Sequence, residues 1–284
     1  MREGLSGDDI FAELMMLRTA DARTFVLLEG PSDCRALDPH IESHSARTLP
    51  AYSKSALERT VALVDERDFE RTLGILDRDW VDVIHAPVES DNLVYTDDYD
   101  LDATILLSGD VLERLVSSVT NRDQRETHLA KMASSVEDSL VTVSARIGIG
   151  RMISTRDGYG VKFEGFPVHT CLDLDSGEVD VGTLATIAVS RSKAPRVEAS
   201  ELADLIDAHE FDPEECRMYC SGHDLAATIV AFIRNRWGGG SISRDTVENM
   251  ARAALGCEDL KSMSFFEAVK DWAMKNQTTV WSCS

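Results

Sequence analysis

The sequence predicts an α/β fold whose core is a parallel sheet flanked by helices, followed by a mixed, mainly helical C-terminal extension. Short apolar runs of strand length alternate with amphipathic helical segments over about the first 120 residues. Such alternation is typical of a parallel sheet with right-handed crossovers. Helical patterns dominate afterwards, so we expect two regions, residues 1–120 and 121–284.

The elements of the first region follow in order. Ser6 and Asp8 can cap a first helix, and Pro31 suits the first position of a helix that follows the first strand. A third helix opens at Ser53 or Ser55 and a fourth covers about 101–117. The expected strands are 25–28, a short one near 48–52, one that begins at about Thr72 and ends at Asp77, and 92–95.

The second region reads mainly as helices: one or two over about 121–153, one at 199–209, one that follows Asp224 and runs to about Trp237, and two last ones at about 244–255 and 265–275. Between them, residues 159–187 alternate and are rich in turn residues, which predicts a few strands or a hairpin. Asp173 and Asp175 lead into a Ser-Gly pair, so a plain turn is favoured there over a ligand site.

Charge is the unusual part of the composition. The 284 residues include 50 acidic and 29 basic side chains, a net charge of −21. Proteins that bind nucleic acid usually carry a basic footprint. Any such contact must therefore come from a local patch, a bound metal or a partner. The simpler alternative is that the charge only confers solubility.

The six cysteines form no Cys-x-x-Cys pair, so free thiols in a reducing compartment are favoured over a zinc site. The first residues lack the apolar core of a signal peptide. No apolar run approaches the length of a membrane span. We therefore expect a cytoplasmic protein without membrane contact.

Acidic residues follow three of the expected strands. Glu29 ends the first, Asp77 and Asp79 follow the third, and the last leads into a cluster that contains Asp97, Asp100 and Asp102. The carboxyl ends of parallel strands share one edge of a sheet, where open α/β folds bind ligands. In an extended chain Asp77 and Asp79 would point to the same side. Carboxylate oxygens are the ligands preferred by Mg²⁺ or Mn²⁺.

Each acidic group also has a simpler interpretation. Asp77 and Asp79 can belong to a solvated junction between strand and loop. The Asp97–Asp102 cluster can be a helix N-terminus that uses the macrodipole. That explanation covers one or two of its acids but not the recurrence of acids at three strand ends.

Four segments resemble one family. FVLLEGPSD at 25–33 and GILDRD at 74–79 resemble the first two motifs of the TOPRIM fold, which is found in topoisomerases, primases and OLD-type nucleases. YTDDYDLD at 95–102 and SGHDL at 221–225 resemble further motifs of the AriB-type TOPRIM effectors of PARIS anti-phage defence systems. The TOPRIM motifs cover about residues 25–107, and the subfamily resemblance spans most of the chain.

The resemblance implies a metal-dependent nuclease effector that cleaves RNA, with tRNA as the expected substrate. It implies restraint by an ABC-type ATPase partner until infection, and it allows a homodimer as the active form. Glu29, Asp77 and Asp79 would hold Mg²⁺ or Mn²⁺, with Asp97, Asp100 and Asp102 as further candidates.

Some residues fit this pattern less closely. The third motif usually ends in Glu, whereas this chain has the shorter Asp102, which puts its catalytic role in question. Lys54 is the nearest candidate for a phosphate-facing cation. His223 could act as a general acid or base, but a capping or structural role for the Gly-His-Asp motif is an equal alternative.

Two rival functions remain open. The same core could serve a DNA-nicking or nucleotidyl-transfer enzyme. Alternatively, a catalytically inactive TOPRIM module could do no more than bind its ATPase.

Overall fold

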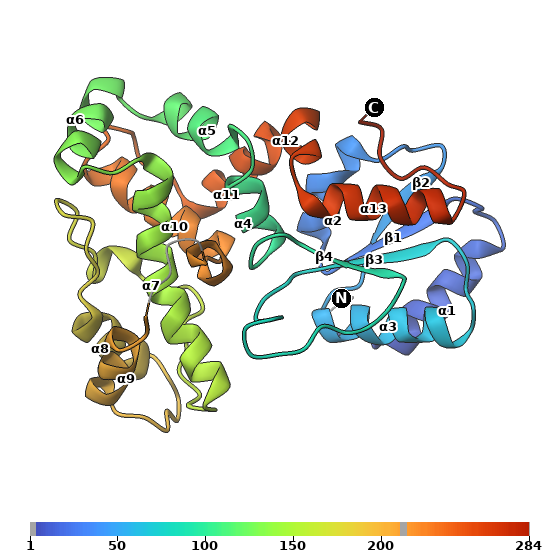
Figure 1. Ribbon diagram of the computed structural model, residues 1–284, viewed down its shortest axis with the longest axis horizontal. Helices are drawn as coiled ribbons and strands as arrows, with labels where there is room; N and C mark the ends of the chain where they lie inside the picture. Colours follow the sequence, from blue (N-terminus) through green and yellow to red (C-terminus); the bar gives the residue numbers. More distant parts are fainter. Residues whose placement is uncertain (1–3, 211–214, 284) are drawn as a thin grey trace. The chain divides into compact units, whose positions relative to one another are not determined.

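The computed structural model describes residues 4–210 and 215–283, and the chain divides into two compact units (Figure 1). Unit 1 comprises the chain up to Asp97 together with the segment from Leu255 onward, and unit 2 runs from Asp98 to Ala254. The expected division near residue 120 therefore differs from the structure in both the boundary and the membership of the last segment.

Unit 1 contains the sheet, which has four parallel strands in the order β2-β1-β3-β4. All residues of β1 and β3 are buried, as expected for central strands covered on both faces, and this explains why their sequences are apolar after the first threonine. The α/β prediction and all four expected strands are confirmed. The strands are β1 (Thr24–Leu28), β2 (Ala46–Pro50), β3 (Thr72–Leu76) and β4 (Leu93–Tyr95).

Helices cover both faces of this sheet, with α1 and α3 on one side and α2 and α13 on the other (Figure 1). Ser6 caps α1 through a capping box with Asp9, and Ser53 accepts a hydrogen bond from Ala56 N at the start of α3. The helices of unit 1 are α1 (Gly7–Arg18), α2 (Pro31–Leu37), α3 (Lys54–Glu66), α12 (Cys257–Lys261) and α13 (Ser264–Lys275), with a 3₁₀ turn η1 (Asp38–His40).

The segment from Leu255 onward joins unit 1 through hydrogen bonds to its first strands. Thr24 Oγ1 lies 2.8 Å from Thr278 Oγ1, and Ser45 Oγ donates to Thr279 O at 2.6 Å. Ile41 and Trp281 form an antiparallel bridge. These contacts join residues more than 200 positions apart, so local sequence patterns could not reveal them.

Unit 2 is built from helices in the part of it that the structure describes. The long helix α7 lies beside α10, and both are largely buried (Figure 1). The helices are α4 (Leu101–Leu106), α5 (Val111–Val119), α6 (Arg122–Met132), α7 (Val136–Arg156), α8 (Val181–Ser190), α9 (Ala199–Asp207), α10 (Gly222–Asn235) and α11 (Arg244–Ala254), with 3₁₀ turns η2 (Val168–Thr170) and η3 (Cys216–Tyr219).

Two local predictions for this unit were wrong. The helix expected at 101–117 is broken between α4 and α5, where Gly109 adopts a left-handed φ of 45°. Residues 159–187 contain no strand. A single antiparallel bridge between Leu172 and Val179 stands in place of the expected strands or hairpin. Asp180 instead caps α8 by accepting from Thr183 N, and the apolar residues that follow pack as a helix.

The turn expected at Asp173 is confirmed, because its Oδ1 accepts from Asp175 N at 2.8 Å.

The cysteines also depart from expectation. Cys257 and Cys283 are joined by a disulfide, whereas all cysteines were expected to be free. The sequence did not predict this pairing, because the two cysteines are 26 positions apart and lie in no recognisable motif. Among the described helices none is both long and apolar enough to span a membrane.

Candidate functional site

Glu29 leaves the sheet directly after β1 and turns back toward the end of β3. Its Oε1 accepts a hydrogen bond from Asp77 N at 3.1 Å, so the two strand ends are linked. Burial raises the pKa of Glu29 to about 7, and the negative charges of Asp79 and Asp33 add to this effect. The hydrogen bond from Asp77 and the charge of Lys54 act in the opposite direction. Near neutral pH this carboxyl is therefore poised between its protonated and ionised forms.

The turn after Glu29 is fixed by the N-terminus of α2. Gly30 N donates to Asp33 Oδ2 at 2.7 Å, and Pro31 occupies the first helical position, where no amide hydrogen is needed. Asp33 is thereby held in the first turn of the helix. This local geometry directs the chain away from the sheet edge and leaves the Glu29 side chain there.

The Asp77–Asp79 segment is a loop and not an extension of the strand. β3 ends at Leu76, and Asp79 has a left-handed φ of 46°. The expected alternation of side chains along an extended strand therefore does not apply. Instead Lys54 Nζ holds the loop, donating to Asp77 O at 2.9 Å and to Asp79 Oδ2 at 2.5 Å.

Arg78 fastens this loop to the end of β4. Its backbone N donates to Thr96 Oγ1 and its Nε to Thr96 O, both at 3.1 Å. Its Nη1 also pairs with Asp82 Oδ2 at 2.7 Å. The loop that presents Asp77 and Asp79 is thus supported from both neighbouring strand ends.

The donor chemistry of this edge fits a hard cation, since Glu29, Asp77 and Asp79 offer only carboxylate oxygens. The ammonium group of Lys54 already occupies a cation position against Asp79. Among the described residues, two groups of three His, Cys, Asp or Glu side chains have ligand atoms that all lie within 4.8 Å of one another, and neither group includes these carboxylates. The three carboxylates are therefore farther apart than the ligands of a single metal ion. A metal would therefore have to displace Lys54 and draw the carboxylates together.

Asp97 has a capping role in unit 1. Its Oδ2 accepts from Ser264 N at 2.6 Å and its Oδ1 from Phe265 N at 2.8 Å. Both oxygens therefore bind the first turn of α13. A metal at Asp97 would compete with this cap.

Asp100 and Asp102 belong to unit 2, where each has partners of its own. Asp100 caps α4 by accepting from Ala103 N at 2.7 Å, and both of its oxygens lie 3.0 Å from Gly222 N. Burial raises the pKa of Asp100 to about 7, and the charge of Asp102 adds to the shift. Asp102 forms a bidentate ion pair with Arg252, with distances of 2.8 Å to Nε and 2.5 Å to Nη2.

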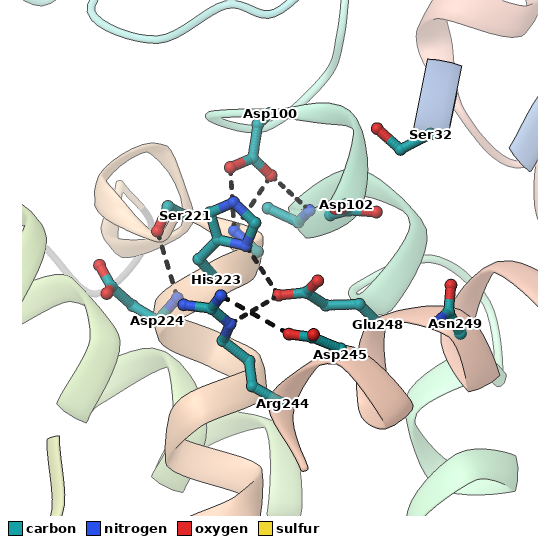
Figure 2. Close-up of polar contacts among 12 residues, drawn as sticks. Ser32, Asp100, Asp102, Ser221, His223, Asp224, Arg244, Asp245, Glu248 and Asn249 are labelled. Carbon is teal, nitrogen blue, oxygen red and sulfur yellow. Dashed lines mark hydrogen bonds and ion pairs between the residues drawn. The ribbon is translucent and has the colours of Figure 1, made fainter. Parts of the chain in front are cut away.

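His223 faces a buried carboxylate across the same group of helices (Figure 2). Its Nδ1 lies 2.7 Å from Glu248 Oε1, and its side chain remains 59% exposed. The hydrogen bond to Glu248 raises the pKa of His223. Burial acts to raise the pKa of Glu248, but His223 and Arg244 outweigh it, so that pKa is lowered. An imidazole oriented by a carboxylate and open to solvent is suited to acid–base chemistry.

A cavity of about 540 Å³ opens beside His223. Three cationic side chains line it together with Asp100 and His223, namely Arg151, Lys162 and Arg244. Arg151 pairs there with the buried carboxylate of Asp224. The cavity can accept a polar ligand in contact with the imidazole.

The Gly-His-Asp motif is explained residue by residue. A Cβ on Gly222 would lie 2.3 Å from Asp102 Cβ, so only glycine fits against the start of α4. His223 contacts Glu248, and Asp224 contacts Arg151, while Ser221 caps α10. The motif therefore serves packing and capping and also presents His223.

Two important side chains were not predicted, Glu248 and Arg252. They lie four residues apart on α11, with Arg244 four residues before Glu248, so the three share a helix face. This spacing of four residues is the sequence feature from which their shared helix face could have been predicted. Donor atoms of Asp102, His223 and Glu248 lie within 4.8 Å of one another, but Arg252 and Arg244 already supply positive charge to both carboxylates.

Comparison with protein-family models finds no match for this chain, and comparison with curated proteins finds no significant relative.

Proposed function

We propose that this chain is a metal-dependent nuclease with a TOPRIM-like core, in which Glu29, Asp77 and Asp79 hold Mg²⁺ or Mn²⁺. The observation that carries the proposal is the half-buried Glu29 carboxyl, hydrogen-bonded to Asp77 N at the carboxyl edge of the sheet. β1 and β3, whose ends supply these residues, are adjacent in the sheet. The four-stranded parallel sheet is compatible with a TOPRIM-like core.

The residues take distinct roles in this proposal. Glu29, with a pKa of about 7, can bind the metal when ionised and carry a proton when neutral. A divalent cation bound there would neutralise phosphate charge and lower the pKa of a water. Glu29 would give up its proton on binding the metal, and Lys54, displaced from Asp79, would be able to face a phosphate. Asp97, in unit 1, is a further ligand candidate if it gives up its cap on α13, whereas Asp100 and Asp102 are engaged by their own partners within unit 2.

His223 takes a separate part in the proposal. Its exposed ring, oriented by Glu248, can transfer a proton to or from a ligand in the unit 2 cavity.

The substrate and partner rest on the resemblance of the motifs. They favour RNA, with tRNA as the substrate, and an ABC-type ATPase that restrains the chain within an anti-phage system in the cytoplasm. A net charge of −21 supports this restraint, because free binding to nucleic acid is disfavoured. The resemblance also allows a homodimer as the active form.

The second candidate is an inactive module that only binds its ATPase, and the Lys54–Asp79 ion pair favours it, because Lys54 occupies the place of a metal. A DNA-nicking enzyme on the same core is a third. Purified chain incubated with RNA and DNA, with Mg²⁺ or with a chelator, distinguishes them. We expect Mg²⁺-dependent RNA ends; DNA nicks would support the third candidate, and no cleavage in the absence or presence of the ATPase would support the module.

A further inference from the structure

An imidazole and two sulfur atoms meet in unit 1, in a cluster that shares no residue with the acidic edge. His40 Nδ1 lies 3.6 Å from Cys283 Sγ and 4.0 Å from Cys257 Sγ. The possible donor atoms of all three residues lie within 4.8 Å of one another. The two sulfur atoms are joined as a disulfide. This is one of the two groups with metal-ligand spacing among the described residues.

The backbone holds these residues together independently of the sulfur–sulfur bond. Ser282 N donates to His40 O at 2.8 Å, and Glu42 N donates to Val280 O at 2.8 Å. The imidazole of His40 also hydrogen-bonds with the backbone of Leu255, two positions before Cys257. Reduction of the disulfide therefore leaves both thiols beside the imidazole.

The chemistry of the reduced cluster suits a soft cation. Thiolate and imidazole ligands select Zn²⁺ and similar metals, whereas Mg²⁺ prefers oxygen. His40 and Cys283 are 7% and 8% exposed, which shields the site, while Cys257 is exposed and gives a metal access from solvent. Three protein ligands also leave one tetrahedral position for water or another ligand.

We propose that His40, Cys257 and Cys283 form a redox-controlled Zn²⁺ site, which binds metal as two thiolates and an imidazole and loses it when the disulfide forms. The two states exclude each other, because each sulfur either binds the metal or the other sulfur.

The oxidation balances with a low-molecular-weight disulfide such as oxidised glutathione. The exposed Cys257 thiolate attacks one sulfur of the oxidant, forms a mixed disulfide and expels one glutathione thiolate. Cys283 thiolate then attacks Cys257 Sγ and expels the second. The protein thiols lose two electrons, the oxidant becomes two thiols, and the metal is released. Reduction by excess thiol reverses the sequence.

The test is a Zn²⁺ titration of the full chain by calorimetry, after reduction and after treatment with oxidised glutathione. With excess Mg²⁺ present to occupy the acidic edge, we expect the reduced chain to bind one Zn²⁺ more than the oxidised chain, with six and four titratable thiols respectively. Co²⁺ in place of Zn²⁺ should give sulfur-to-metal charge-transfer absorption, which Mg²⁺ should not suppress.

Variants identify the ligands. Cys257→Ser, Cys283→Ser and His40→Asn should each weaken Zn²⁺ binding by at least about a hundredfold, the upper range for losing even an outer-shell partner. Cys171→Ser, at a buried free cysteine in unit 2, is the matched control and should bind as the wild type does.

The comparison of reduced and oxidised wild type requires no variant to fold. A reduced chain that binds no more Zn²⁺ than the oxidised chain overturns the proposal. So does unchanged binding in folded Cys257→Ser and Cys283→Ser.

Discussion

At the scale of single residues, the position of Glu29 was predictable and its environment was not. The end of an apolar run located it at a strand end. Burial is the main cause of its raised pKa and the charge of Asp79 contributes less, and the sequence pattern reports neither. Glu248 and Arg252 were missed because their partners, His223 and Asp102, lie 25 and 150 positions away in the sequence.

Replacing Glu29 should remove the loss of stability that its ionisation causes as pH rises. A raised pKa stabilises the fold fully below the unfolded value of 4.5, and this contribution is lost as pH rises through about 7. Glu29→Gln keeps an acceptor for Asp77 N but cannot ionise. Urea unfolding of metal-free protein should show the variant more stable than wild type above pH 7, by about 1–2 kcal/mol, and equal to it below pH 4.5.

The control for this effect is Glu66→Gln, an exposed carboxylate at the end of α3. The stability of Glu66→Gln relative to wild type should not change with pH in this way. A Glu29→Gln variant whose stability follows that of wild type at every pH would contradict the burial of this carboxyl.

His223 should respond to its carboxylate partner. Because the hydrogen bond to Glu248 raises the pKa of His223, Glu248→Gln should lower that pKa. An NMR titration of the imidazole protons measures the shift. Asp245→Asn, on the same helix at a side chain 79% exposed, should leave it nearly unchanged. An equal shift in both variants would mean that general charge, not the hydrogen bond, sets this pKa.

At the scale of elements, caps and apolar periodicity predicted most helices and all four strands. Ser6, Ser53 and Pro31 start helices where the sequence indicated. The failure at residues 159–187 has a physical cause: alternation over a few residues cannot distinguish a strand from a helix that begins at a capping Asp180. The α4–α5 break depends on one backbone angle at Gly109, which periodicity does not report.

Close packing at Gly222 gives a test of this element scale. Gly222→Ala places a Cβ 2.3 Å from Asp102 Cβ and 2.8 Å from Ala103 N, so α4 and α10 must separate. We expect a loss of about 1–3 kcal/mol in the free energy of unfolding. A Cβ added at Gly240 would have no neighbouring atom within 4 Å, so Gly240→Ala should change the free energy of unfolding by less than about 0.5 kcal/mol. Equal effects at the two sites would refute the close contact.

At the scale of the whole molecule, the sequence predicted a sheet unit and a helical extension but not where the chain divides. The return of residues after Leu255 to unit 1 depends on contacts such as Asp97 with Ser264, 167 positions apart. No periodicity or composition shift marks that return. Net charge, by contrast, is a property of the whole sequence and needed no structure.

Removing the segment after Ala254 should therefore damage unit 1 and spare unit 2. The truncated chain loses α12, α13 and the partners of Asp97 and Thr24. Limited proteolysis with mass spectrometry should show faster cleavage within residues 4–97 while helices α7 and α10 stay protected. Protection of unit 1 equal to that in the full chain would contradict the assignment of this segment.

The central claim is that the acidic edge of unit 1 performs metal-dependent cleavage. The most direct measurement is Mg²⁺-dependent RNA cleavage by wild type, Glu29→Gln, Asp77→Asn and Asp82→Asn, each with its fold checked by circular dichroism. Glu29→Gln and Asp77→Asn should lose at least about a hundredfold in rate, the scale of a missing acid–base group. Asp82→Asn alters an acid 52% exposed, paired with Arg78 on the same loop, and should stay active. Full activity in folded Glu29→Gln and Asp77→Asn would contradict the claim.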